Sequence, residues 1–246
     1  MSKRLLRREP ISKVSWSREL KAHRLAVTIY NFTMRMVPFR IKYGIGGWAR
    51  RARAPYCLLG NGSIVVQIGA PFDMVFSGRS RAVYFGILAG QKGKVVVVEP
   101  DARNLRAVED YAKRHGITNM VLCPKCAWSE KRELKFYIND WHPASNFTEG
   151  CKSYGSARLK SFRILVLPAD TIDNILGDLD IKFIDLISIT TNGAEREILD
   201  GMKQTLARGV QYISLARTGD DYIELMKDAG YILHSYDDRG YTFQRL

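Results

Sequence analysis

Three apolar runs of this sequence end in residues that could hold a nucleoside. The residues that close or follow these runs are Gln67, Gly69, Ala70 and Asp73 in the first, Glu99, Pro100 and Asp101 in the second, and Ala127 and Trp128 in the third. A glycine lets the backbone approach a ligand closely, a carboxylate can accept hydrogen bonds from both ribose hydroxyls, and a tryptophan ring can flank an adenine. Gly69 and Glu99 stand 30 residues apart, which suits neighbouring parallel strands joined by a helix. The pattern predicts a nucleoside-binding site.

One histidine is placed to do acid–base chemistry. His142 lies in the irregular stretch 129–163, and a histidine outside a regular element can act as a general base near neutral pH. Asp140 or Glu149 could orient its ring. A surface loop turned by Pro143 would explain the same residues without a catalytic role. We predict that His142 acts as the general base.

The elements that must position these residues alternate between strands and helices. Apolar runs predict strands at 64–68, 94–99, 121–123, 184–189 and 211–215, and helices are predicted at 79–90, 103–115, 194–206 and 221–229. Residues 231–236 and 241–246 flank a turn sequence, which is typical of a hairpin. The alternation predicts an α/β fold: a doubly wound, mostly parallel, Rossmann-like sheet of seven strands that ends in an antiparallel hairpin. Ligands of such sheets bind at the carboxyl ends of the strands.

Charge divides the chain at about residue 56. Of the 246 residues, 1–56 hold 14 Lys and Arg against two acids, whereas 57–246 hold 24 against 23. We therefore predict a basic, helical N-terminal arm on 1–56 and a nearly neutral body on 57–246, in which 129–163 forms a short hairpin and loop that could act as a lid. The composition is that of a globular protein and excludes a disordered chain, a collagen-like repeat and a small disulfide scaffold.

The arm contains an apolar stretch at 25–39. A membrane-spanning helix needs about 20 apolar residues, so this stretch is too short to span, and no small-residue cleavage site marks it as a signal peptide. On a helix, Leu20, Val27, Met34 and Phe39 share a face with basic flanks, as in a helix lying in the headgroup plane. A helix that packs on its own body or on another chain has the same pattern. The predicted partners of the arm are an anionic membrane surface or a protein complex, with nucleic acid less favoured.

The cysteines bear on location and on metal binding. Four cysteines, Cys57, Cys123, Cys126 and Cys151, are too few for a secreted disulfide framework, so a cytoplasmic location is predicted, with peripheral membrane association if the arm binds lipid. Cys123 and Cys126 form a C-x-x-C pair, but zinc would need two more ligands, such as His142 and Cys151. A redox pair is the other alternative. With no second paired motif, buried apolar cysteines and no metal site are predicted.

Four segments match the motifs of one known family. The motif D-x-G-A-N-x-G stands here as Gln-Ile-Gly-Ala-Pro-Phe-Asp at 67–73, and E-P stands as Glu99-Pro100. A T-x-D segment stands at 171–173, and I-D-L-I-K-I-D-V-E-G-A-E stands as Ile-Asp-Leu-Ile-Ser-Ile-Thr-Thr-Asn-Gly-Ala-Glu at 184–195. Over about half its length, the chain resembles the FkbM-type S-adenosylmethionine-dependent methyltransferases.

The resemblance implies a class I methyltransferase fold, S-adenosylmethionine as cofactor, and methyl transfer to a hydroxyl of a sugar or another small molecule. Gly69 and its neighbours would face the methionine part of the cofactor, Glu99 the ribose and Trp128 the adenine edge. Glu195 matches an acid of the family, which implies a role in the catalytic site, although an acid in the first turn of a helix also complements the helix dipole.

Several positions depart from the family pattern. Gln67 replaces the first acid, and Ser188, Thr190 and Asn192 replace the lysine, aspartate and glutamate of the last motif. Threonine and asparagine side chains cannot remove a proton near neutral pH, so any base must be another residue. The alternative functions are a catalytically degenerate subunit that binds or assembles within a complex and, third, an RNA methyltransferase or RNA-binding protein. A nicotinamide enzyme is disfavoured because G-x-G-x-x-G is absent.

Overall fold

The computed structural model describes residues 25–26, 28–30, 32–140, 142–151, 159–237 and 239–246. Within these ranges, no helix has the length and apolarity needed to cross a bilayer. Leu20 and Val27, expected on the apolar face of the arm, lie outside the described residues.

The main sheet has the predicted seven strands. They are β1 (Ile64–Ile68), β2 (Lys94–Val98), β3 (Met120–Cys123), β8 (Ile184–Ile189), β9 (Val210–Leu215), β10 (Tyr231–Tyr236) and β11 (Tyr241–Arg245), in the order β10-β11-β9-β8-β1-β2-β3. The last strand, β11, is antiparallel to both β9 and β10, and the other pairs are parallel. The prediction of a doubly wound, mostly parallel sheet with an antiparallel hairpin is confirmed.

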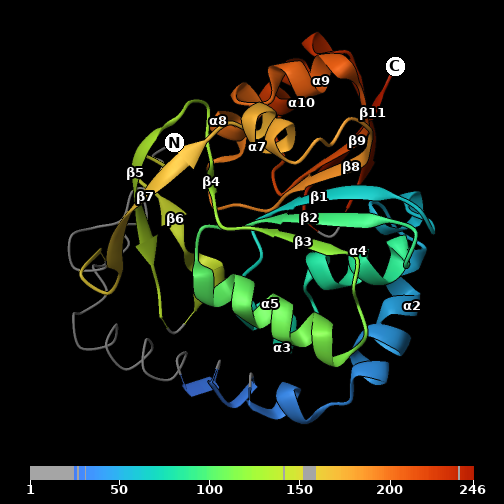
Figure 1. Ribbon diagram of the computed structural model, residues 1–246, viewed down its shortest axis with the longest axis vertical. Coiled ribbons are helices and arrows are strands. Elements are labelled where there is room, and N and C mark those ends of the chain that lie inside the picture. The colour runs from blue at the N-terminus through green and yellow to red at the C-terminus, as the bar shows by residue number, and fades with distance from the viewer. Residues whose placement is uncertain (1–24, 27, 31, 141, 152–158, 238) are drawn as a thin grey trace, which may run out of the picture.

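Helices cover both faces of this sheet (Figure 1). One face carries α2 (Gly46–Arg51), α3 (Phe72–Phe76), α4 (Arg81–Ala89) and α5 (Ala102–Arg114); the other carries α7 (Ile172–Asp178), α8 (Glu195–Asp200), α9 (Lys203–Arg208) and α10 (Asp220–Asp228). The four valines of β2, Val95–Val98, are at most 1% exposed and point alternately into the two core layers on either side of the sheet. This burial explains why the sequence of β2 is continuously apolar. A strand buried on both faces needs no polar alternation.

One predicted helix is divided in two, and the short helices α3 and α7 were not predicted. The helix expected at 194–206 is divided into α8 and α9 around Gly201, where a Cβ would lie 2.0 Å from the Trp128 carbonyl oxygen. Within the arm predicted to be helical, the π-helical turn η1 (Arg40–Ile45) leads directly into α2. The short 3₁₀ turn η2 (Tyr56–Leu58) then precedes β1.

A second sheet stands beside the main one (Figure 1). Its strands are β4 (Cys126–Ala127), β5 (Arg132–Ile138), β6 (Phe147–Thr148) and β7 (Arg163–Asp170), in the order β4-β7-β5-β6. The antiparallel pairing of β5 with β6 confirms the hairpin expected within 129–163, and the 3₁₀ turn η3 (Pro143–Ser145) lies between them. The long antiparallel pairing of β5 with β7 was not predicted.

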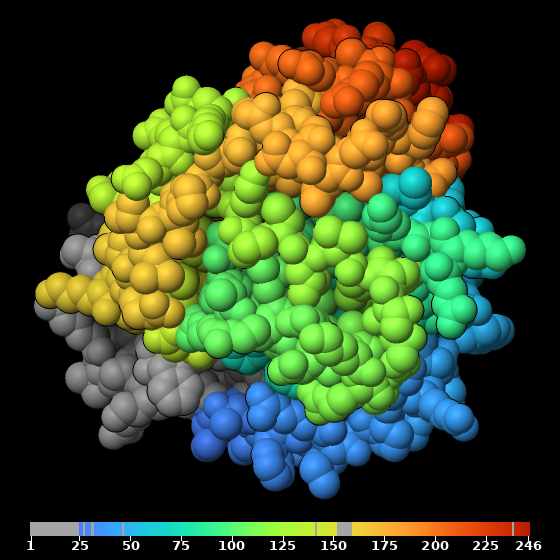
Figure 2. All heavy atoms as spheres, viewed as in Figure 1, coloured from blue at the N-terminus to red at the C-terminus, as the bar shows by residue number. Residues whose placement is uncertain are grey.

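The N-terminal segment packs against the helices of one face. Tyr43 and Tyr56 are each 2% exposed and belong to the core formed with α4 and α5. The Tyr43 hydroxyl donates to the Val75 carbonyl at 2.9 Å, and Phe39 stacks on His115 with ring centroids 4.1 Å apart. This blue segment forms one margin of the molecule in Figure 2.

Candidate active site

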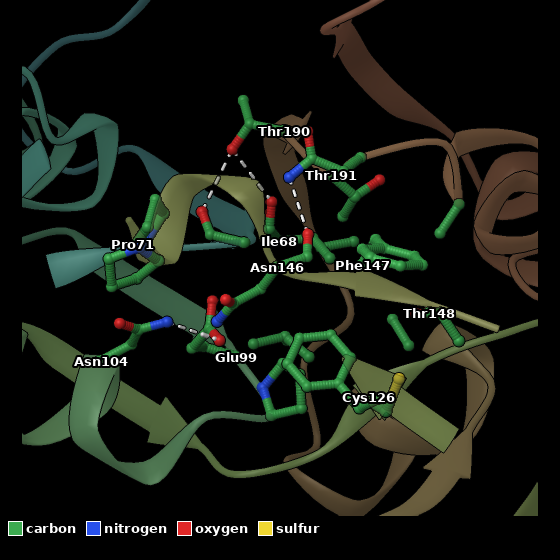
Figure 3. A pocket seen from close by; sticks show the side chains of 18 of the residues that line it. Ile68, Pro71, Glu99, Asn104, Cys126, Asn146, Phe147, Thr148, Thr190 and Thr191 are labelled. Carbon is green, nitrogen blue, oxygen red and sulfur yellow. Dashed lines mark hydrogen bonds between the residues drawn. The ribbon is translucent and has the colours of Figure 1, made fainter. Parts of the chain in front are cut away.

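A pocket of about 570 Å³, counting its open mouth, lies at the carboxyl ends of β1, β2 and β8 (Figure 3). These ends are held together by backbone bonds: Gly69 N–H donates to the Val98 carbonyl, and Thr190 N–H donates to the Ile68 carbonyl, each at 2.9 Å. Residues of the second sheet, including Phe136 and Phe147, complete its wall. The pocket therefore lies where ligands bind in open α/β sheets.

The structure brings only part of the predicted cofactor set to the pocket. Among the described residues, its lining includes Gly69, Glu99, Pro100 and Ala127 and does not include Gln67, Ala70, Asp73, Asp101 and Trp128. Trp128 is 8% exposed and packs in the core, where its carbonyl meets Gly201. The aromatic wall is instead formed by Phe136 and Phe147, whose approach requires the pairing of β5 with β6. No motif of the sequence marked them.

Glu99 is a buried carboxylate at the edge of this pocket. It is 4% exposed; its Oε1 accepts from the Asp101 backbone N–H and the Asn104 amide, each at 3.0 Å, and its Oε2 accepts from the Ala70 N–H at 2.7 Å. Burial raises the pKa of this carboxyl, against the effect of the three donors. Because each carboxylate oxygen can accept two bonds, Oε2 keeps capacity for a ligand donor.

Ala70 and Asp101 support this carboxylate instead of lining the pocket. Asp101 also caps α5 by accepting from the Arg103 backbone N–H at 2.9 Å. Gly69 has a φ of +85°, and a Cβ there would lie 2.5 Å from the Thr190 carbonyl oxygen. The close approach of β1 and β8 at the pocket therefore requires glycine at this position.

Gln67 and Thr190 form a neutral pair where the family motifs have two acids. Gln67 Nε2 donates to Thr190 Oγ1 at 2.7 Å and to the Gly69 carbonyl at 2.8 Å. Thr190 Oγ1 also lies 3.1 Å from the Gly69 carbonyl oxygen, so its proton has an acceptor. Two carboxylates at this separation could not both ionise without a cation or a shared proton. The amide–hydroxyl pair avoids that cost.

Asn192 holds the cover of the pocket. Its Nδ2 donates to the carbonyls of Ala144 and Asn146, both at 2.7 Å, and thereby fixes η3, whose residues Pro143 and Ala144 line the pocket, against the chain that follows β8. A glutamate, which the family motif has here, carries no donor when ionised and would face two carbonyl oxygens. The departure from the motif therefore has a structural reason specific to this chain.

Replacing Asn192 with glutamate should loosen this cover. Leaving two buried carbonyls without their donor costs about 1–3 kcal/mol each, so we expect faster amide hydrogen exchange at Ser145 and Asn146 and a lower free energy of unfolding. The isosteric Asn192→Asp variant should behave in the same way, because it loses the same donors. Unchanged exchange in both variants would show that the cover is held by other contacts.

His142 lies beside the pocket and is close to a buried acid. Its Nδ1 is 3.9 Å from Asp73 Oδ2, and its neighbours Pro143 and Ala144 line the pocket. Asp73 is 4% exposed; burial raises the pKa of its carboxyl, while the charge of His142 and the backbone N–H groups of Ala144 and Met74 oppose this rise. A modest closure would give a carboxylate–imidazole pair, and such bonds often tighten only in the substrate complex.

The expected orienting residues, Asp140 and Glu149, do not serve His142. Asp140 forms ion pairs with Arg103 and Arg163, and Glu149 pairs with Lys135 at 3.0 Å. Basic residues brought close by β5, β7 and α5 neutralise both acids, so that hypothesis was wrong. The acid that faces the imidazole follows β1, far from His142 in the sequence.

Glu195 does not line the pocket, although its neighbour Ala194 does. It is fully buried, and its Oε2 pairs with Arg217 Nε at 3.0 Å. This ion pair links the first turn of α8 to the chain that leaves β9. Its charge also contributes, after burial, to raising the pKa of the Cys151 thiol to about 12. Its catalytic role stays a prediction.

The C-x-x-C cysteines are buried. Cys123 and Cys126 are 8% and 4% exposed, and burial raises the pKa of the Cys126 thiol to about 11. In the part of the chain that the structure describes, no group of three His, Cys, Asp or Glu side chains could hold a metal ion.

Comparisons with known proteins identify the family of this chain. The model described as the methyltransferase FkbM domain matches residues 67–233, more than half of the chain. No curated protein matches. Among solved structures, an FkbM methyltransferase from Methylobacillus flagellatus KT is 13% identical, with 93% of this chain and 60% of that chain covered and a TM-score of 0.47. A SAM-dependent methyltransferase from Aquifex aeolicus is 12% identical, with 89% and 95% covered and a TM-score of 0.43. Fibrillarin from Aeropyrum pernix, solved with natively bound S-adenosyl-L-methionine, is 11% identical, with 82% and 74% covered and a TM-score of 0.43.

Proposed function

This chain belongs to the FkbM family of methyltransferases, and on that premise we propose that it transfers the methyl group of S-adenosylmethionine to a hydroxyl oxygen of a sugar or another small molecule. The observation that carries the proposal is the Glu99 carboxylate, buried at the edge of a pocket where β1 and β2 end. A cytoplasmic location stays a prediction from the cysteine content.

The residues of the pocket fit this cofactor. Glu99 Oε2 has acceptor capacity for a ribose hydroxyl, Phe136 and Phe147 offer an apolar wall for adenine, and Gly69 keeps the β1 turn open for the methionine part. When bound, S-adenosylmethionine supplies an electrophilic methyl group on its sulfonium.

The protein's own contribution is to place the acceptor and remove its proton. Holding a hydroxyl oxygen in line with a bound electrophile accounts for much of the rate enhancement in such transfers. We assign the proton to His142, whose side chain is 39% exposed beside the pocket. Asp73 would orient the imidazole and stabilise its protonated form as a positioning residue.

Removal of the Glu99 carboxylate tests the cofactor site. Losing a charged hydrogen-bond acceptor costs about 1.5–3 kcal/mol, so Glu99→Ala should bind S-adenosylhomocysteine about ten- to a hundred-fold more weakly in a calorimetric titration. The exposed Glu133→Gln variant is the matched control and should bind as wild type does. Thermal unfolding of both variants checks that the fold is retained. Wild-type affinity in folded Glu99→Ala would refute the assignment.

A second function, that of a binding or assembly subunit without turnover, is supported by one observation. Three positions at which the family motifs have acids carry neutral groups in this chain, Gln67, Thr190 and Asn192, and each of these side chains is used in a structural hydrogen bond. Transfer of labelled methyl groups to a panel of sugars and hydroxylated small molecules separates the two. Cofactor binding without transfer to any of them would favour the subunit. Transfer to RNA in parallel would favour the nucleic-acid alternative.

A further inference from the structure

The N-terminal segment presents an unpartnered apolar face. Of the fourteen large apolar side chains exposed among the described residues, eight lie between 25 and 48. Residues 25, 26, 28–30 and 32–36 are helical. Four of the five large apolar side chains exposed on this helix recur at i, i+4, i+7 and i+11: Leu25 (62%), Ile29 (53%), Phe32 (66%) and Met36 (75%); the fifth is Tyr30. This spacing places the four on one side of a helix. It differs from the face expected from the sequence, because Met34 and Phe39 are partly covered by the body.

Further apolar side chains are exposed on the elements that follow this helix. Ile41, Ile45 and Trp48, on η1 and α2, are 49%, 73% and 79% exposed. Trp48 has the largest exposed fraction of any residue in this segment's apolar set. Amphipathic aromatic side chains of this kind favour the interface between lipid and water. An exposed apolar face of this extent indicates a binding surface.

A basic cleft adjoins this face. It is lined by Arg35, Lys42, Arg114 and His115 together with the rings of Phe39 and Phe76, and Met36 belongs to both the cleft and the apolar face. The Arg35 guanidinium lies 4.4 Å above the Phe76 ring. Among the described residues that line the cleft, none is an acid. Arg114 and His115 lie at the C-terminal end of α5, whose dipole they complement. Arg35 and Lys42 stand in the last turns of the two helical stretches of the N-terminal segment.

Burial and nearby positive charge lower pKa values in this cleft. Burial lowers the pKa of Lys42, and burial followed by the charges of Arg114 and Lys42 lowers the pKa of His115. In the sequence, no acidic residue occurs between Glu19 and Asp73. A site with this potential attracts an anion, and an adjoining apolar face attracts an acyl layer.

We propose that residues 25–53 dock the protein on an anionic phospholipid membrane, with the apolar face in the interface and the basic cleft holding headgroup phosphates. Apolar side chains flanked by arginine and lysine on a short helix are what an interfacial helix requires. A second copy of the chain suits this surface poorly, because two acid-free basic faces repel. Nucleic acid would satisfy the charge and leave the apolar face exposed to water.

The test is flotation of the full-length protein with vesicles of phosphatidylcholine alone or mixed with phosphatidylglycerol. Wild type should float with the mixed vesicles and less so as salt rises. Arg35→Gln with Arg114→Gln should weaken this partition by about five-fold per charge, and Phe32→Ser with Met36→Ser should reduce it further. Residues 1–24 are unchanged in every variant, so their charges cancel in the comparison.

Matched control variants distinguish binding through this surface from non-specific binding to vesicles. Phe183→Ser, at an 80% exposed apolar residue elsewhere, and Lys131→Gln with Arg132→Gln should bind as wild type does. Brominated lipids should quench a component of tryptophan fluorescence that is missing in Trp48→Phe. Vesicle binding that is absent in wild type, or equal in wild type and the surface variants, would overturn the proposal. So would a vesicle-independent dimer, seen by sedimentation, that the Phe32→Ser, Met36→Ser variant abolishes.

Discussion

Replacing His142 with alanine is expected to lower the turnover number for methyl transfer by about 10²–10⁴-fold, the usual contribution of a general base. The imidazole lies at the side of the pocket, 3.9 Å from the Asp73 carboxylate, and it does not line the space assigned to the cofactor. Affinity for S-adenosylhomocysteine should therefore stay nearly unchanged. Because a base must be unprotonated, wild-type turnover should rise with pH and then level off, whereas the residual activity of the variant should lack this dependence.

Two variants complete this experiment. Asp73→Asn keeps the volume of the buried acid but removes its charge, so it should lower turnover less than His142→Ala and displace the pH profile. His234→Ala, at an exposed histidine of β10, should have wild-type turnover. Full turnover with an unaltered pH profile in His142→Ala would exclude this histidine as the base while leaving the methyltransferase function intact.

The second large effect is expected on stability, from the ion pair of Arg81 and Asp237. Their atoms are 3.0 Å apart with side chains at most 1% exposed. Arg81 also donates to the hydroxyls of Ser188 and Ser214 at 3.1 and 2.7 Å. Removing one partner of a buried pair leaves an uncompensated charge and costs about 3–5 kcal/mol. Asp237→Asn should therefore lower the free energy of unfolding by about that amount, measured in denaturant near neutral pH.

This loss should depend on pH. Burial alone would raise the pKa of the Asp237 carboxyl, but Arg81, the Ser214 hydroxyl and the backbone N–H groups of Arg239 and Gly240 outweigh it and hold the pKa below its usual range. A depressed carboxyl pKa stabilises the fold above the pKa of the unfolded chain, and this stability is lost as pH falls through the folded value. The difference between wild type and Asp237→Asn should therefore shrink in acid.

A double variant distinguishes charge from packing at this pair. Arg81→Met combined with Asp237→Asn removes both charges and should be more stable than Asp237→Asn alone. Glu109→Gln, which breaks the exposed pair with Lys113, should leave the unfolding free energy unchanged within error. An Asp237→Asn variant as stable as wild type at neutral pH would mean that the pair adds nothing to the anchoring of the terminal hairpin.

The resemblance to a family could be seen in the sequence, but the chemistry of its altered positions could not. Thr190 and Asn192 stand where the motif has acids, and the sequence alone permits both loss of function and replacement by new contacts. The structure shows that Thr190 accepts a bond from Gln67 and that Asn192 donates two bonds to the cover of the pocket. Each substitution thus has partners that an acid could not satisfy in the same way.

The seven strands of the main sheet, its antiparallel end and the strand ends at which the pocket lies could all be predicted from the sequence. These features follow from local apolar periodicity and turn residues, which each segment carries without reference to the rest of the chain. The second sheet was missed in part because it depends on the pairing of β5 with β7, two strands separated by a long stretch of chain, and the local pattern of neither strand specifies that pairing. Three features could be seen only in the folded chain: the approach of His142 to Asp73, the neutral pair of Gln67 with Thr190, and the exposure of Phe32 and its neighbours. They depend on which distant segments meet and which side chains the body leaves uncovered, and residue spacing along the chain encodes neither.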